Sequence, residues 1–77
     1  MASHLSDIPR PVPVPKMPIE LCQFLKFAAL TSSGGEAKQA ISEGRVQVNR
    51  VVESRKRRKL VLGDQVTFAG QTIVVAS

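Results

Sequence analysis

The stretch that decides the fold is LCQFLKFAALTSSGGEAKQAISEGRVQVN, residues 21–49. In its first part, apolar side chains recur at the three- and four-residue spacing that makes one face of a helix: Leu21, Phe24, Leu25 and Ala28. This spacing predicts a first helix from about Ile19 to Ala29, with Gln23 and Lys26 on its polar side. Phe27 lies between the two faces, and we expect it to pack against the neighbouring helix rather than stack on a nucleobase.

A helix-capping pattern follows at Ser33 and Glu36. A serine followed three residues later by glutamate satisfies the free amides at a helix start, so a second helix of about ten residues should begin just after Ser33. Its apolar stripe is Ala37, Ala40 and Ile41. Gly44, which adopts left-handed backbone angles easily, should end it.

Alternating residues then predict two β-hairpins. Val46 and Val48 alternate with polar residues, Asn49-Arg50 makes a turn, and Val51-Val52 begins the return strand. A second hairpin is expected after a turn at Leu62-Gly63-Asp64, with Val66 and Phe68 opposite Ile73 and Val75 across Ala69-Gly70. The predicted fold is therefore α+β, with two N-terminal helices packed on a small, mainly antiparallel β-sheet.

All five prolines lie within residues 1–18, at positions 9, 11, 13, 15 and 18. Proline fixes φ and lacks an N–H, so this segment cannot form a helix or a central strand. We therefore predict a disordered, extended tail over residues 1–18, followed by a single domain over residues 19–77. The tail serves either as a spacer, which we favour, or as a ligand for an aromatic groove.

Charge points to a polyanionic partner. Eleven Lys and Arg residues against six Asp and Glu residues give a formal net charge of +5, and the isoelectric point is near 10.2. No apolar run approaches the roughly 20 residues that span a bilayer, so we expect no membrane association. The single cysteine, Cys22, has no disulfide or metal-ligand partner and suits a helix edge in a reducing, cytoplasmic protein.

The densest feature is a run of five consecutive cations, Arg55-Lys56-Arg57-Arg58-Lys59. Core packing cannot explain five adjacent charges, and we expect an extended ribbon with cations on both of its sides. Their mutual repulsion falls when phosphates lie close by, which favours nucleic acid over a run that only aids solubility.

A second candidate anion site is the start of the second helix. Free amides and the positive end of the helix dipole follow Ser33, and Gly34 and Gly35 allow close backbone approach. A flexible loop without a ligand explains the two glycines equally well. Lys38 and Arg45 extend the positive surface.

Catalysis is not expected. The only histidine, His4, lies in the predicted tail, and the acidic residues are scattered along the chain. Gly34-Gly35 lacks the spacing and the lysine of a nucleotide phosphate-binding loop. We expect no metal and no cofactor.

The chain resembles the S-four-like RNA-binding domain, or alpha-L motif, named after a small-subunit ribosomal protein. The resemblance covers nearly all of residues 19–77 and lies in LCQFLK at 21–26, SGGEAK at 33–38, Ile41, Gly44, RVQVN at 45–49 and LGD at 62–64. The residues around Glu53-Ser54-Arg55-Lys56-Arg57 look most like the short stand-alone bacterial members. Many members have a basic residue where this chain has Gly34, and a glycine where it has Arg50.

This resemblance implies RNA lying across the second helix and the adjoining strand and turn, with phosphates on Ser33 and Lys38 and the binding turn at Asn49-Arg50. Together with the two charge features, it gives the candidate RNA-contacting residues: Lys26, Ser33, Gly34, Gly35, Lys38, Arg45, Asn49, Arg50, Arg55, Lys56, Arg57, Arg58 and Lys59.

We expect non-catalytic binding of structured ribosomal or transfer RNA through phosphate and shape contacts, by a monomer associated with the ribosome. The alternative is an interaction module that docks on an acidic protein surface. A DNA-binding function is disfavoured because the chain has no recognition-helix pattern.

Overall fold

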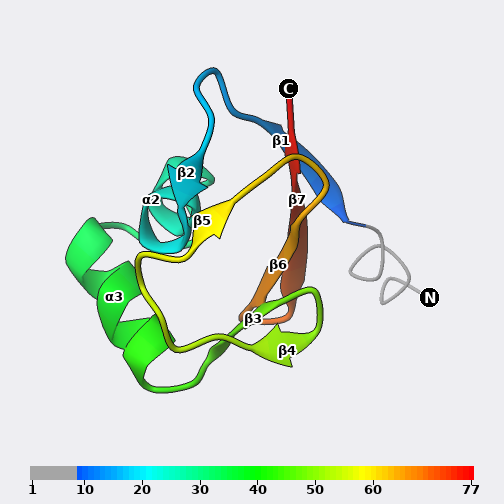
Figure 1. The fold of residues 1–77 in the computed structure, drawn as a ribbon. Coiled ribbons are helices and arrows are strands. Elements are labelled where there is room, and N and C mark those ends of the chain that lie inside the picture. The colour runs from blue at the N-terminus through cyan, green and yellow to red at the C-terminus, as the bar shows by residue number, and fades with distance from the viewer. Residues whose placement is uncertain (1–8) are drawn as a thin grey trace.

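A computed structural model describes residues 9–77. It contains two helices, α2 (Leu21–Phe27) and α3 (Gly34–Ser42), and two sheets. The strands are β1 (Arg10–Pro13), β2 (Ile19–Glu20), β3 (Val46–Val48), β4 (Val51–Val52), β5 (Lys59–Leu60), β6 (Gln65–Phe68) and β7 (Gln71–Ala76). Both helices lie on one side of the five-stranded sheet, with the short β2–β5 pair beside α2 (Figure 1).

Helix α2 is shorter than the expected span of residues 19–29. At its start, Ile19 and Glu20 pair with β5 instead of entering the helix. At its end, Ala29 adopts a positive φ of 61°. The amides of Ala29 and Leu30 then donate to the Lys26 and Leu25 carbonyls, each at 3.0 Å, which is the Schellman arrangement that closes a helix.

Helix α3 forms as its sequence predicts. The Ser33 hydroxyl accepts a hydrogen bond from the Glu36 amide at 3.1 Å, which caps the first turn. At the other end, Gly44 has a φ of 74°, and its amide and that of Arg45 donate to the Ile41 and Ala40 carbonyls. The apolar stripe is buried as expected.

The five-stranded sheet has the order β1-β7-β6-β3-β4. Both expected hairpins are present, with Val48 opposite Val51 and Phe68 opposite Gln71. The central residues of both two-residue turns have positive φ, as type I′ turns require. All neighbouring strands in this sheet are antiparallel except β1 and β7.

Strand β1 corrects the expected disordered tail. Residues 10–13 pair in parallel with β7, and the Val14 amide donates to the Ala76 carbonyl at 2.9 Å. Val12 and Val14 are buried, whereas Pro11 and Pro13 are exposed. In a strand, alternate residues direct their polar groups to opposite sides, so the prolines face the free edge, where no N–H is required. The expected tail over residues 1–8 lies outside the described residues.

The core lies between the helices and the sheet. Its largest fully buried side chains come from both layers: Leu21, Phe24, Leu25, Ile41, Val46, Val48, Leu60, Val66 and Ile73. Cys22 is buried at the start of α2, as predicted. Within residues 9–77, no helix is both long and apolar enough to cross a bilayer.

Candidate nucleic-acid interface

The five consecutive cations form a folded turn, which corrects the expected extended ribbon. We call residues Arg55–Lys59 the basic turn. The chain reverses at Lys56 and Arg57, and the Arg58 amide donates to the Arg55 carbonyl at 3.2 Å. Lys59 then enters strand β5. Lys56, Arg57 and Lys59 are exposed and make no side-chain hydrogen bond or ion pair within residues 9–77.

The buried carboxylate of Glu53 accepts hydrogen bonds from two arginines of the basic turn. Glu53 is only 6% exposed, and its Oε2 accepts from the Arg55 amide and from Arg55 Nε, both at 2.9 Å. Its Oε1 accepts from Arg55 Nη2 at 3.0 Å and from Arg58 Nη1 at 2.9 Å. The hydrogen bonds from Arg55, and then the single one from Arg58, hold the pKa of the Glu53 carboxyl far below its usual range. Glu53 therefore stays ionised among five cations.

The backbone of the basic turn also caps helix α2. The Arg58 carbonyl accepts from the Leu21 amide at 2.8 Å, and the Lys56 carbonyl accepts from the Cys22 amide at 3.1 Å. These are first-turn amides that have no partner within the helix. The turn is thereby attached to α2 by its backbone, while its exposed side chains remain free to meet a ligand.

The start of α3 is partly occupied by a carboxylate of the chain itself. Glu36 Oε1 accepts from the Ser32 amide at 2.6 Å and from the Ser32 hydroxyl at 2.8 Å, and these bonds lower the pKa of Glu36. Gly34 and Gly35 are not required by packing, because an added Cβ would meet nothing closer than 3.9 Å. The α3 start therefore has an open backbone, but one of its preceding amides already binds an anion.

Two further predicted site residues, Asn49 and Arg45, have structural partners, whereas the neighbouring Arg50 side chain has none within residues 9–77. The Asn49 side chain donates from Nδ2 to Asp64 Oδ1 at 3.1 Å, and its Oδ1 accepts from the Gln65 amide at 3.0 Å. Arg45 pairs with Glu43 at 3.3 Å and lies over the Phe68 ring, 5.6 Å from its centre. Arg50 is exposed at the β3–β4 turn with a φ of 70°. Asn49 thus joins the turn to the start of β6.

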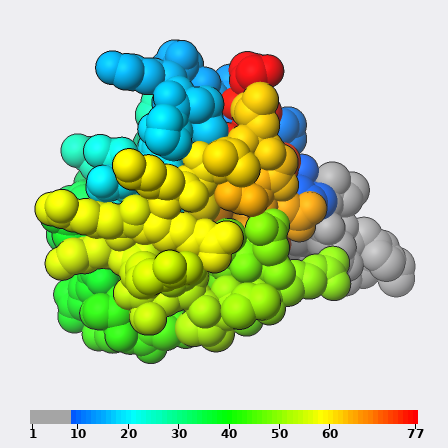
Figure 2. Space-filling model, in the orientation of Figure 1, coloured from blue at the N-terminus to red at the C-terminus, as the bar shows by residue number. Residues whose placement is uncertain are grey.

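Not all of the candidate residues are brought together. In Figure 2 the yellow surface of the basic turn adjoins the green surface of α3 on one face of the molecule. Lys38 and Lys26 are exposed on the two helices that flank this turn. The β3–β4 turn with Asn49 and Arg50 lies on the opposite side of the view from the basic turn (Figure 1).

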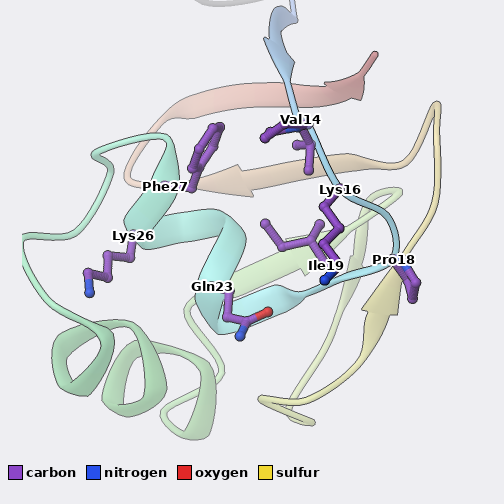
Figure 3. Close-up of a pocket in the computed structure, with 8 residues that line it drawn as sticks. Val14, Lys16, Pro18, Ile19, Gln23, Lys26 and Phe27 are labelled. Atoms are coloured by element: carbon purple, nitrogen blue, oxygen red, sulfur yellow. The ribbon is translucent and has the colours of Figure 1, made fainter.

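A hollow that the sequence did not reveal lies along α2 (Figure 3). Its volume is about 600 Å³, and its lining is Val14, Pro15, Lys16, Pro18, Ile19, Gln23, Lys26 and Phe27. Phe27 is 51% exposed, contrary to the expectation that it packs against the neighbouring helix. The local sequence held no signal for this hollow, because its other wall is the segment that was expected to be disordered.

The comparison with known families gives the identity of the fold. A family model described as the S4 domain matches residues 12–76. The chain belongs to the S4 domain family. The match begins at Val12, so it covers the second half of β1 as well as the helices and hairpins.

Curated relatives of this S4 domain are similar over most of their length. The "Putative RNA-binding protein YbcJ" of Escherichia coli (strain K12) is 48% identical over 59 residues, which cover 77% of this chain and 84% of that protein. The "Probable ribosome maturation protein RlbA" of Bacillus subtilis (strain 168) is 43% identical over 60 residues, covering 78% of this chain and 84% of that protein.

A solved structure has the same fold. The solution structure of YbcJ from Escherichia coli, described as revealing an αL motif involved in RNA-binding, matches with a TM-score of 0.67 and 44% identity. The match covers 87% of this chain and 86% of that one. The family expected from the sequence is thus confirmed. The alternative of a module that docks on an acidic protein surface is not favoured by these relatives.

Proposed function

We propose that this S4 domain binds structured RNA, ribosomal or transfer RNA, through phosphate and shape contacts and without catalysing a reaction. The observation that carries the proposal is the basic turn, whose exposed cations are held on a backbone attached to α2. Relatives named for RNA binding and for ribosome maturation support it and favour association with the ribosome.

The proposed interface runs from the basic turn across the start of α3. Lys56, Arg57 and Lys59 would contact phosphates directly, with Lys38 and the open backbone at Gly34 beside them. Only three phenylalanines are present, and Phe24 and Phe68 are buried. Stacking along a loose single strand is therefore disfavoured, and a helix recognised by its shape fits the surface better.

The dependence of RNA affinity on salt tests the proposal. Each phosphate contact lowers log affinity by about 0.7 to 0.9 per unit of log salt, because binding releases a condensed counterion. The variant Lys56→Gln/Arg57→Gln should bind an RNA hairpin about 10-fold or more weakly at low salt. Because two phosphate contacts are lost, the slope of log affinity against log salt concentration (the salt slope) should be shallower by about 1.5. Fluorescence anisotropy at a series of KCl concentrations measures both quantities.

The matched control is Arg10→Gln/Lys16→Gln, which removes the same charge from two exposed residues outside the basic turn. If binding depended only on net charge, the two double variants would weaken it equally. Equal loss of RNA affinity in the two double variants would show that the basic turn is not the interface. Absence of binding by the natural chain at low salt would refute the function itself.

A further inference from the structure

We propose that Glu53 is a positioning residue for RNA binding, whose carboxylate presets the basic turn so that Lys56, Arg57 and Lys59 face the phosphates together. The inference rests on the proposed function and adds a role for a negative charge inside the cationic surface. The sequence placed Glu53 in the stretch that resembles short bacterial family members, but it indicated no role for this residue beside the run of basic ones.

The hydrogen bonds of Glu53 join the two ends of the basic turn. One carboxylate oxygen binds the backbone amide and Nε of Arg55, and the other binds Arg55 Nη2 and Arg58 Nη1, all at 2.9–3.0 Å. Four donors from both ends of the turn thus meet a single buried group. This arrangement fixes the turn more tightly than one surface ion pair would, because its geometry is bidentate and the carboxylate is shielded from water.

Glu53 also connects the turn to the rest of the fold. Its own amide donates to the Val46 carbonyl at 3.0 Å, which places the residue on the sheet. The turn that it holds accepts hydrogen bonds from the first amides of α2. Glu53 therefore joins the sheet to the basic turn, and the backbone of that turn in its own right binds α2.

Arg55 remains able to meet a ligand although it binds Glu53. The Arg55 side chain is 73% exposed, and only its Nε and Nη2 bind the carboxylate. A guanidinium has five N–H donors, so several donors of Arg55 stay available to a phosphate. Glu53 thus orients Arg55 without removing it from the surface.

Charge and positioning predict opposite effects of removing this carboxylate. If only charge mattered, Glu53→Gln would strengthen RNA binding, since one negative charge leaves a surface that attracts a polyanion. If positioning matters, the five cations repel one another once the carboxylate is neutral, and the turn opens. RNA binding must then offset the conformational entropy that is lost when the turn is ordered again. We expect Glu53→Gln to bind roughly 10-fold more weakly, with a shallower salt slope.

The experiment uses the full chain and a 20-base-pair RNA hairpin as the probe, with dissociation constants measured from 50 to 300 mM KCl. The matched control is Glu43→Gln, which removes the same charge from an exposed carboxylate outside the basic turn. It should bind as tightly as the natural chain or slightly more tightly. Circular dichroism establishes that each variant is folded at the temperature used.

A folded Glu53→Gln variant that binds as well as the natural chain, or better, would overturn the inference. If this variant does not fold, Arg55→Lys/Arg58→Lys decides, because it keeps every positive charge but loses the bidentate geometry. Weaker binding by this variant supports the inference, and unchanged binding overturns it. The proposed function fails separately, if the natural chain does not bind the hairpin at 50 mM KCl.

Discussion

Arg50 occupies a backbone position that suits glycine. Its φ of 70° lies in the left-handed region, where a side chain costs about 1–2 kcal/mol. Arg50→Gly removes this strain, which stabilises the fold, but it also gives the unfolded chain more conformational freedom, which opposes folding. Because the first effect is the larger, we expect the free energy of unfolding to rise by up to about 1 kcal/mol. Urea denaturation measures the change. A decrease would show that the Arg50 side chain itself stabilises the fold.

Ala69 provides the matched control, because it lies in the other type I′ turn with a φ of 54°. Ala69→Gly should stabilise the domain to a similar degree without changing its charge. If Arg50 contacts RNA, Arg50→Gly should also lower RNA affinity, whereas Ala69→Gly should leave it unchanged. Equal affinities in both variants would place Arg50 outside the interface.

At single residues, the sequence predicted local backbone conformation better than it predicted hydrogen-bond partners. Asn49 was correctly placed on a tight turn, but both ends of its amide are used by Asp64 and the Gln65 backbone, which are distant in sequence. Glu53 was not singled out, since nothing local shows that its side chain is buried. Whether a side chain can bind a ligand or is already hydrogen-bonded within the protein depends on such contacts between residues distant in sequence. Residue type and local spacing do not reveal these contacts.

Among the elements, β1 offers a direct test, because it pairs with β7 in a segment that was expected to be disordered. Val12 and Val14 are buried against the core, and shortening both side chains removes four buried carbons. At about 0.8 kcal/mol for each buried CH₂, Val12→Ala/Val14→Ala should lower the free energy of unfolding by about 3 kcal/mol, and by more once the cost of the cavity is added. Thermal or urea denaturation followed by circular dichroism measures it.

Pro13→Ala is the control for this element, because Pro13 is exposed on the same strand. Its effect should stay below about 1 kcal/mol and arise from the greater freedom of the unfolded chain. A double valine variant as stable as the natural chain would mean that β1 does not dock on β7 in solution.

The elements predicted correctly are those whose signals are local. Helix α3 has its cap, apolar stripe and terminating Gly44 within twelve residues of sequence, and each hairpin has its turn between its two strands. By contrast, β1 pairs with β7 at the other end of the chain, and its alternating prolines hide the alternating buried valines. The basic turn was misread as extended because its shape depends on Glu53 and on the amides of α2.

For the whole molecule, charge and stability are linked through the acidic groups. The net charge of +5 makes self-repulsion grow as carboxylates become protonated. Two of these carboxylates, Glu53 and Glu36, are held ionised by hydrogen bonds in the folded state. The domain should therefore lose stability in acid, through specific bonds as well as through general repulsion.

Comparing the natural chain with Glu53→Gln separates these two causes. Arg55 and then Arg58 hold the folded-state pKa of Glu53 well below its ordinary value of 4.5, so the unfolded state binds the proton first as the pH falls. The stability that Glu53 contributes is fully present above about pH 5, and below pH 4.5 it declines steadily towards pH 2. Urea unfolding at fixed ionic strength should show a large difference between the two proteins at pH 7 and a much smaller one at pH 2.5. Parallel curves over this range would mean that Glu53 is not held by its arginines in solution, and the presetting of the basic turn would lose its physical basis.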